Sequence, residues 1–328
     1  MLRMDGFDYQ HASSPEAAVD LFHARPGSVY VAGGTDLLPN IKHRIIKAQH
    51  VIGLATALPQ GWEEVADEAS PSGRALRIGA GTRLSRLARC EALPALATAA
   101  GLVAGPQIRN MGTLGGNVLL DTRCLFYNQT EFWRKSLGYC LKAEGDWCHV
   151  VGGPKTCVAT QSSDTVPVLL AQDASVRLLG PDGERWLRLR ELYRFDGKDH
   201  LKIAPGEVLT HVRVPLPGPA ARSSYHKVRT RGSIDFPQLS VAIFGDFEGA
   251  VPRSLEIVIG AVNPAPKPVR GLEAFLGRAL DGAAIAEIAE VVHKQTRPQG
   301  SVAGDTSWRR HMASVTVRRG LEALAAGA

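Results

Sequence analysis

Glycine-rich turns at the ends of predicted strands constrain this chain more than any other feature of its sequence. They lie at residues 33–35 (Gly-Gly-Thr), 79–82 (Gly-Ala-Gly-Thr) and 112–117 (Gly-Thr-Leu-Gly-Gly-Asn). Glycine permits positive φ and close approach of another group, and free N–H groups at a following helix favour an anion. One such turn is common. Three within one region of about 120 residues predict loops that converge on one extended anionic ligand.

The first turn is predicted to join a short buried strand, residues 28–34, to a helix. Thr35 is the expected N-cap of that helix, and Asp36 falls in its first turn. The residues expected to share one helical face are Leu37, Leu38, Ile41 and Ile45. The pattern differs from the G-x-G-x-x-G fingerprint of a βαβ unit, so we expect no Rossmann fold.

The cysteines of this chain are clustered in the sequence. Four of the five, Cys124, Cys140, Cys148 and Cys157, fall within 34 residues, with 15, 7 and 8 residues between neighbours. The surrounding segment is rich in aromatic residues and has little regular periodicity, so it would gain order by wrapping a metal centre. Clustered cysteines in a chain that is not exported indicate metal or redox chemistry rather than disulfides.

Four thiolates suit either zinc or an iron–sulfur cluster. Compact zinc sites use C-x₂₋₄-C pairs, and this segment contains none. The wide spacing therefore favours a cluster over zinc. His149, beside Cys148, could replace one cysteine as a ligand. We prefer a role for it outside the ligand set, either next to the ligands or facing solvent. Cys90 lies next to the apolar face of a predicted helix, 83–90, and is interpreted as an ordinary buried thiol.

The composition is that of a globular protein, with 45% hydrophobic and 21% charged residues. No run of about 20 apolar residues occurs, and the first residues lack the apolar core of a signal peptide. We therefore expect a cytoplasmic protein with no membrane association. The net charge of +6 is mild, and no basic block with interleaved aromatics occurs. An acidic partner subunit or an anionic cofactor is expected rather than nucleic acid.

The remaining pattern predicts an α+β chain of two domains, residues 1–185 and 186–328, with the cysteine-rich insert at 122–161. Further strands are expected at 51–54, 76–78, 174–179, 206–214, 224–230, 239–247 and 255–262, with an irregular loop or hairpin at 57–74. Further helices are expected at 93–103, 269–280, 282–296 and 306–326, and residues 166–171 are expected to be helical or tightly turned. In the last helix Met312, Val315 and Leu324 mark an apolar stripe for the core or a subunit contact.

Three motifs together resemble a known family. They are residues 31–38 (Val-Ala-Gly-Gly-Thr-Asp-Leu-Leu), 113–117 (Thr-Leu-Gly-Gly-Asn) and 163–167 (Ser-Asp-Thr-Val-Pro). In this order they are similar to the FAD-binding motifs in flavoprotein subunits of the molybdenum hydroxylases, the xanthine dehydrogenase and carbon monoxide dehydrogenase family. The insert resembles the branch with an extra [4Fe–4S] cluster in this subunit, the β subunit of 4-hydroxybenzoyl-CoA reductase.

The resemblance implies a fold of the vanillyl-alcohol-oxidase/PCMH type, in which two small α/β subdomains hold FAD and a C-terminal sheet-and-helices domain follows. It implies that Val31, Ala32, Gly33, Gly34, Thr35, Asp36, Leu37 and Leu38 surround the pyrophosphate. Thr113, Gly115, Gly116, Asn117 and Leu119 would line the FAD cleft. Asp164 would hold the ribityl and flavin region, and Leu209 and Lys227, on neighbouring strands, would lie at the isoalloxazine ring. Cys124, Cys140, Cys148 and Cys157 would be the cluster ligands.

The function that the resemblance implies is electron transfer. Electrons from reduced ferredoxin would pass through the [4Fe–4S] cluster and FAD to a [2Fe–2S] subunit and a molybdenum-cofactor subunit, which would dehydroxylate 4-hydroxybenzoyl-CoA to benzoyl-CoA. No catalytic residue is expected in this chain, because its sequence offers no acid–base pair for that substrate. The alternative is a flavoprotein subunit of another molybdenum hydroxylase that oxidises its substrate. A more distant alternative is a non-enzymatic scaffold with structural zinc.

Overall fold

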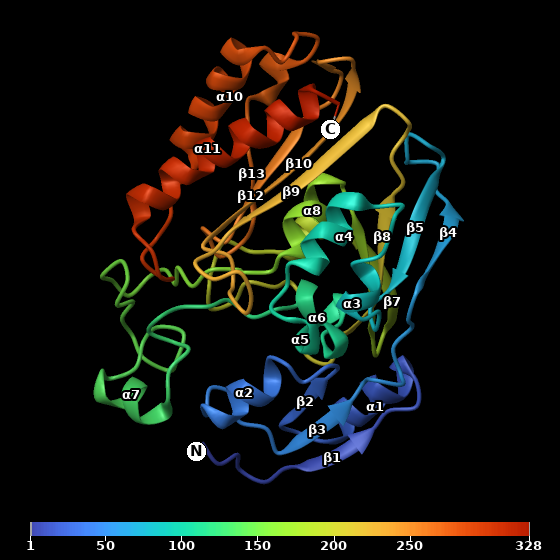
Figure 1. Ribbon diagram of the computed structural model, residues 1–328. Helices are drawn as coiled ribbons and strands as arrows, with labels where there is room; N and C mark the ends of the chain where they lie inside the picture. The colour runs from blue at the N-terminus through green and yellow to red at the C-terminus, as the bar shows by residue number, and fades with distance from the viewer. Residues whose placement is uncertain (1, 328) are drawn as a thin grey trace.

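The computed structural model describes residues 2–327, and within them the chain forms three sheets (Figure 1). A three-stranded sheet lies at the N-terminal end, a five-stranded sheet in the middle of the chain, and a second five-stranded sheet near the C-terminus. The mixed helix and sheet architecture confirms the expected α+β fold, with two α/β subdomains followed by a sheet covered by helices.

The N-terminal subdomain is a parallel sheet in the order β1-β3-β2, made of β1 (Asp8–His11), β2 (Ser28–Val31) and β3 (His50–Gly53). Helix α1 (Pro15–Ala24) connects the first two strands. It begins where the Ser14 hydroxyl accepts a hydrogen bond from the N–H of Ala17, with proline in the first turn, and it buries Ala18 and Val19.

Helix α2 (Leu37–Lys42) follows the first glycine turn but is shorter than predicted. The residue before it is Asp36 rather than Thr35, and its side chain makes no capping hydrogen bond. Because the helix ends at Lys42, Ile45 cannot share its face. Ile45 instead packs against the buried cysteines of the insert.

The second subdomain is an antiparallel sheet in the order β4-β5-β8-β6-β7. Its strands are β4 (Trp62–Ala66), β5 (Arg74–Gly79), β6 (Ser175–Gly180), β7 (Gly183–Arg188) and β8 (Val208–Pro215). The segment 57–74 thus forms a hairpin with β5. Strand β8 pairs with both β5 and β6, so the boundary at residue 185 that the sequence predicts would divide this sheet.

Six short helices accompany the second subdomain. They are α3 (Leu84–Leu87), α4 (Pro94–Gly101), α5 (Pro106–Met111), α6 (Leu114–Val118), α8 (Thr165–Ala171) and α9 (Leu189–Leu192). Helix α5 is absent from the sequence-based prediction, which treats residues 105–106 as a helix end. Proline is well tolerated in the first turn of a helix, and here Pro106 starts the next one.

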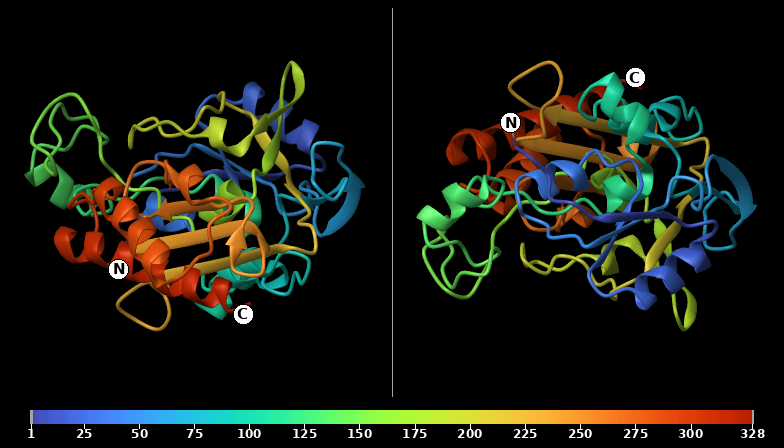
Figure 2. Two further views of the ribbon diagram at one scale, coloured as in Figure 1. Left: turned by 90° about the horizontal axis from the view of Figure 1, so that it is seen from above. Right: turned by 90° about the horizontal axis from the view of Figure 1, so that it is seen from below.

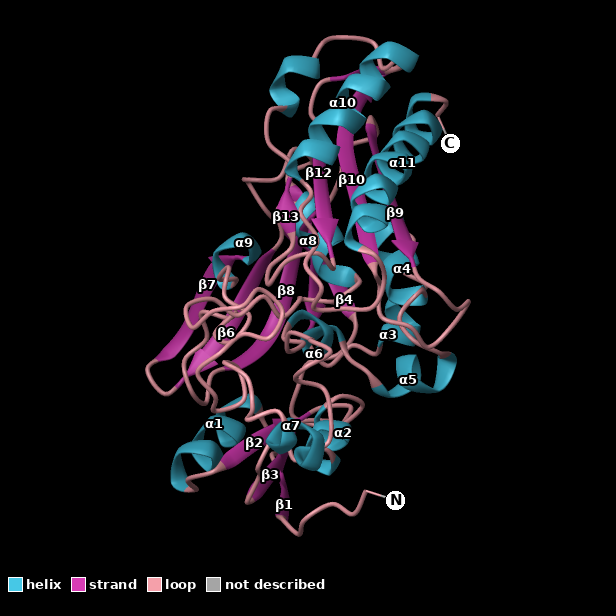
Figure 3. Cartoon of the chain, turned by 90° about the vertical axis from the view of Figure 1, so that its left-hand side faces the viewer, coloured by secondary structure: helices cyan, strands magenta, loops and turns pink. Residues whose placement is uncertain are grey.

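The C-terminal domain is built on β9 (Ala221–Val228), β10 (Leu239–Glu248), β11 (Val251–Pro252), β12 (Glu256–Gly260) and β13 (Lys267–Pro268). Helices α10 (Gly282–Gln295) and α11 (Thr306–Ala325) cover one face, and α4 and α8 pack on the other (Figure 3). Strand β10 matches this arrangement, because Val241 and Ile243 belong to the core under the two long helices while Ala242 belongs to the core around α8.

The predicted helix at 269–280 is wrong. Only a 3₁₀ turn, η1 (Leu272–Phe275), forms there among the described residues. Gly271 and Gly277 both adopt positive φ, at 82° and 75°, so the chain leaves the helical conformation on either side of the turn.

The cysteine-rich insert forms a separate lobe beside the body of the molecule (Figures 1 and 2). Its neck is closed by two backbone hydrogen bonds between Arg123 and Thr160, of 2.8 and 2.7 Å. Helix α7 (Glu131–Ser136) is its regular element. The buried guanidinium of Arg134 donates to the carbonyls of His43 and Arg44, at 3.2 and 2.8 Å, and so attaches the lobe to the end of α2.

Helix α11 contains a buried arginine that joins three segments of the C-terminal domain. Arg309 is fully buried and donates hydrogen bonds to the carbonyls of Gln238, Gln299 and Ala261, at 2.8, 2.8 and 2.6 Å. Burial lowers the pKa of its guanidinium to about 10. Of the predicted stripe, Leu324 is buried in the core of this domain, whereas Met312 and Val315 are only partly buried. No helix within residues 2–327 has the length and apolar character needed to cross a bilayer.

We expect the substitution Arg309→Met to lower the free energy of unfolding by about 3 kcal/mol, because one buried and two partly buried carbonyls lose their donor. The measurement is equilibrium unfolding in urea. Arg318→Met on the exposed side of the same helix is the matched control and should change little. Equal midpoints for the two variants would contradict this role of Arg309.

Candidate functional site

A cleft of about 570 Å³ lies between the N-terminal subdomain and the second subdomain. Most of its lining residues come from five stretches distant in sequence, within residues 30–39, 112–123, 162–164, 207–209 and 234–236, and single residues between positions 46 and 108 complete the wall. The walls are largely apolar with a few charged groups, as is usual for a site that binds an organic cofactor. The first and third glycine turns both line this cleft.

Most residues predicted for the cofactor site line this cleft. They are Val31, Ala32, Gly33, Gly34, Thr35, Asp36, Leu37, Thr113, Gly115, Gly116, Asn117, Leu119, Asp164 and Leu209. The other two, Leu38 and Lys227, are not among the lining residues. Leu38 packs beside Gly34, where a Cβ on the glycine would lie 3.1 Å from the leucine side chain. Lys227 lies behind Asp164.

The first glycine turn needs glycine at position 33 because its backbone touches the backbone at the start of the third turn. A Cβ on Gly33 would lie 2.1 Å from the carbonyl oxygen of Met111. Gly34 adopts a φ of +70°, in the left-handed region that side chains disfavour. The two turns therefore meet backbone to backbone at the wall of the cleft.

None of the described residues that line the cleft belongs to the second glycine turn, residues 79–82. It supports the third turn instead. The N–H of Gly115 donates to the carbonyl of Ala80 at 2.8 Å, and a Cβ on Gly115 would lie 2.9 Å from that of Ala80. The prediction that all three turns converge on the ligand is therefore wrong for this one, because its glycines accommodate neighbouring protein chain.

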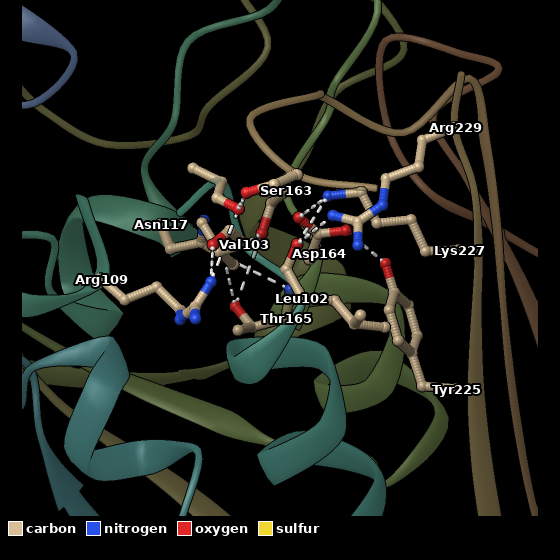
Figure 4. A network of polar contacts seen from close by, with 12 residues as sticks. Leu102, Val103, Arg109, Asn117, Ser163, Asp164, Thr165, Tyr225, Lys227 and Arg229 are labelled. Carbon is tan, nitrogen blue, oxygen red and sulfur yellow. Dashed lines mark hydrogen bonds and ion pairs between the residues drawn. The ribbon is translucent and has the colours of Figure 1, made fainter. Parts of the chain in front are cut away.

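Asn117 connects the third turn to the Ser-Asp motif. Its side-chain oxygen accepts hydrogen bonds from the hydroxyls of Ser163 and Thr165, at 2.6 and 2.7 Å (Figure 4). Thr113 caps the short helix α6, because its hydroxyl accepts from the N–H of Gly116 at 3.1 Å. Both side chains thus hold loops in place at the wall of the cleft.

Asp164 forms a buried ion pair with Lys227, 2.8 Å apart, and their side chains are 3% and 1% exposed. Its other oxygen accepts from the hydroxyl of Tyr225 at 2.6 Å, and the ammonium of Lys227 also donates to the carbonyl of Leu102 at 3.0 Å (Figure 4). Burial raises the pKa of Asp164 and lowers that of Lys227, and each partner opposes the shift of the other.

The expectation that Leu209 and Lys227 lie on neighbouring strands is wrong. Leu209 is on β8, which pairs with β5 and β6, whereas Lys227 is on β9, which pairs with β10 in a different sheet. The two residues approach the cleft region from separate domains. Asp164 is the residue that both lines the cleft and contacts the lysine.

Several charged and aromatic residues of the cleft escape sequence-based prediction. Arg123 forms an ion pair with Asp36, and its guanidinium lies 4.0 Å from the ring centre of Phe236. Burial raises the pKa of Asp36, and the charge of Arg123 opposes this. These contacts join residues far apart in sequence and follow no motif. The signal for these residues in the sequence is the position of Asp121 and Arg123 beside the first clustered cysteine.

The four clustered cysteines meet at a second, smaller cavity inside the lobe. Cys124, Cys140, Cys148 and Cys157 all line it, all are buried, and none forms a disulfide in the described chain. Burial and the neighbouring thiols raise the pKa of Cys124 to about 11. Cys90 lies instead in the main hydrophobic core, as predicted.

The surroundings of these cysteines are apolar, with one buried cation. Tyr127 and Ala159 pack around the thiols, and Lys142 lines the cavity with its side chain 5% exposed. His149 also lines it, and its Nε2 is 2.6 Å from the carbonyl oxygen of Tyr139.

Within residues 2–327, no three His, Cys, Asp or Glu side chains stand so that they could hold one metal ion. The four thiols nevertheless line one cavity with no carboxylate among its lining residues. Four cysteines are the donor set of [2Fe–2S] and [4Fe–4S] clusters. The residues present therefore fit such a group chemically.

Comparison with known proteins agrees with this architecture. Residues 5–217 match the family described as FAD binding domain in molybdopterin dehydrogenase. Residues 223–324 match the family described as CO dehydrogenase flavoprotein C-terminal domain. The two matches cover nearly the whole chain, and the chain belongs to the FAD-binding flavoprotein subunits of the molybdopterin dehydrogenases, a family of oxidoreductases.

Individual relatives support the same class. The aldehyde oxidoreductase FAD-binding subunit PaoB of Escherichia coli is 33% identical over 290 residues, covering 84% of this chain and 87% of the relative. The carbon monoxide dehydrogenase medium chain of Afipia carboxidovorans is 27% identical over 330 residues, covering 96% of each.

Solved structures show the same fold. Reconstituted CO dehydrogenase from Oligotropha carboxidovorans has a chain with a TM-score of 0.77 and 24% identity, covering 99% of this chain and 100% of its own. Quinoline 2-oxidoreductase from Pseudomonas putida has one with a TM-score of 0.76 and 18% identity, covering 99% of each.

We expect the substitution Gly33→Ala to reduce the flavin content of the purified protein at least several-fold, because a Cβ there forces the two turns apart. The measurement is the ratio of flavin to protein absorbance after gel filtration. Gly218→Ala is the control, since a Cβ at Gly218 meets nothing within 4 Å. Unchanged flavin occupancy in Gly33→Ala would contradict the role of this contact.

Proposed function

We propose that this chain is the electron-transfer flavoprotein subunit of a molybdenum hydroxylase that oxidises its substrate. A molybdenum-cofactor subunit and a [2Fe–2S] subunit would be its partners, and the substrate chemistry would take place on the former. The observation that carries the proposal is the cleft itself, lined by the two glycine turns, in a chain that matches such subunits over both domains.

FAD in the cleft would supply the exchange between one-electron and two-electron carriers. Residues 31–37 would surround its pyrophosphate, with the N–H groups of the first turn available to the phosphate oxygens. Leu119 and Leu209 would provide apolar contacts. Asp164 would bind polar groups of the ribityl chain or flavin, and Lys227 would keep that carboxylate oriented through their ion pair.

We further propose that Cys124, Cys140, Cys148 and Cys157 hold a [4Fe–4S] cluster. Support comes from the four buried thiols that line one cavity, and from the wide spacing in sequence that argues against a zinc knuckle. Such a cluster would supply one-electron transfer next to the cleft. Asp121 and Arg123 line the cleft and Cys124 lines the cysteine cavity, so four consecutive residues span both sites.

Aldehydes are the substrate class that we favour for the complex, because PaoB is 33% identical and is described as a subunit of an aldehyde oxidoreductase. The second candidate is the β subunit of 4-hydroxybenzoyl-CoA reductase, with reduced ferredoxin as electron donor. The four-cysteine insert favours that reading. The two relatives described above are an aldehyde oxidoreductase subunit and a carbon monoxide dehydrogenase medium chain, and they support the oxidative candidate.

The two candidates predict opposite reactions of the purified complex. We expect aromatic or aliphatic aldehydes to bleach the flavin absorbance of the anaerobic complex within the turnover time, and 4-hydroxybenzoyl-CoA with reduced ferredoxin to give no benzoyl-CoA. The readouts are visible absorbance and product chromatography. Benzoyl-CoA formation without aldehyde-dependent bleaching would favour the reductase and contradict the oxidative proposal.

The cluster assignment has its own test in metal content. We expect Cys140→Ser to lower iron and acid-labile sulfide strongly and to leave FAD largely bound, because the thiol lines the cysteine cavity and not the cleft. The matched control is Cys90→Ala, which removes a buried thiol from the main core. Unchanged iron in Cys140→Ser, or zinc in the anaerobically purified wild type, would contradict the assignment.

A further inference from the structure

A buried polar junction lies where the cleft and the cysteine cavity adjoin. The ammonium of Lys142 donates to the carboxylate of Asp121 at 2.6 Å, to the hydroxyl of Thr122 at 2.6 Å and to the carbonyl of Gly197 at 2.8 Å. Lys142 lines the cysteine cavity, whereas Asp121 lines the cleft. The ion pair therefore has one end at each site.

The junction holds the lysine firmly on the side of the cysteines. Gly197 accepts from Lys142, and its own N–H donates to the carbonyl of Cys157 at 2.8 Å. A Cβ on Gly197 would lie 2.6 Å from the backbone nitrogen of Ala159, so this loop is pressed against the segment that contains the fourth cysteine. The ammonium also lies 4.8 Å from the ring centre of Tyr127, which packs against the thiols.

The charge of Lys142 acts on the thiols because it is shielded from water. Its side chain is 5% exposed, and a charge in such a place interacts several times more strongly than one at the surface. Three acceptors already use its donors, so its role toward the cysteines is electrostatic. The carboxylate of Asp121 partly offsets the same field.

We propose that Lys142 is a tuning residue that raises the reduction potential of the iron–sulfur centre held by the four cysteines. This inference rests on the proposed cluster. Adding one electron makes the thiolate-bound centre one unit more negative, and a fixed cation beside it stabilises that state. Asp121 opposes the effect from the cleft side, so the two residues of one ion pair have effects of opposite sign.

The test is a dithionite titration of the anaerobically purified holo complex, followed by the electron paramagnetic resonance signal of the reduced cluster. We expect Lys142→Met to shift the midpoint potential downward and Asp121→Asn to shift it upward. Asparagine keeps an oxygen that can accept from the lysine, so a role limited to holding the fold would not produce the upward shift. Lys135→Met, on the exposed surface of α7, is the control and should leave the potential unchanged.

The outcomes separate this inference from the proposed function. A wild-type complex with no [4Fe–4S] signal beside that of the [2Fe–2S] subunit would overturn the cluster assignment and this inference with it, and a complex without flavin would overturn the proposed function. A normal cluster signal with the wild-type potential in both Lys142→Met and Asp121→Asn would overturn the tuning role alone. If Lys142→Met fails to retain iron, the sign of the shift in Asp121→Asn decides, and a downward or absent shift counts against the inference.

Discussion

The buried ion pair between Asp164 and Lys227 is the interaction on which the arrangement of this molecule depends. Lys227 belongs to the C-terminal sheet, and Asp164 lies directly before α8 at the wall of the cleft. Removing two charges from water is costly, and losing either partner leaves the other buried and uncompensated. The pair is supported by Tyr225 and by the carbonyl of Leu102. It therefore fixes the C-terminal domain to the cleft in one orientation.

The cleft obtains its shape from contacts between backbones. Gly33 meets the carbonyl of Met111, and Gly115 rests on Ala80. Such contacts leave no side chain whose rotation could absorb an error, so the distance between the two turns is set by the chain itself. Preorganised walls of this kind reduce the ordering that a bound cofactor must impose. The polar side chains of Asn117 and Thr113 complete this by holding each loop against the next.

Sequence patterns predicted the parts of this structure that depend on local chemistry. The positions of the glycine turns, the strand at 239–247 and the gathering of four cysteines in one place all follow from short-range pattern or composition. The reason for the glycines did not follow, because Gly115 faces Ala80, a residue 35 positions earlier in the chain. Likewise Arg123 and Asp36 are separated by 87 residues, and no local signal pairs them. The helix predicted at 269–280 does not form, because two glycines with positive φ interrupt the segment despite its apolar pattern. Here local backbone conformation overrides the side-chain pattern.

The cysteine lobe has only a small core around its thiols, so its place depends on attachments to the body of the molecule, two of which lie at its neck and its far side. Its neck is the backbone pairing of Arg123 with Thr160, and its far side is held by Arg134 at the end of α2. Both attachments end on segments that also line or adjoin the cleft. A lobe tied at one point could swing and change its distance from the cleft, whereas two attachments on the same wall prevent this. The cysteine cavity is therefore held beside the cleft, the arrangement that the proposed electron exchange between the two sites would require.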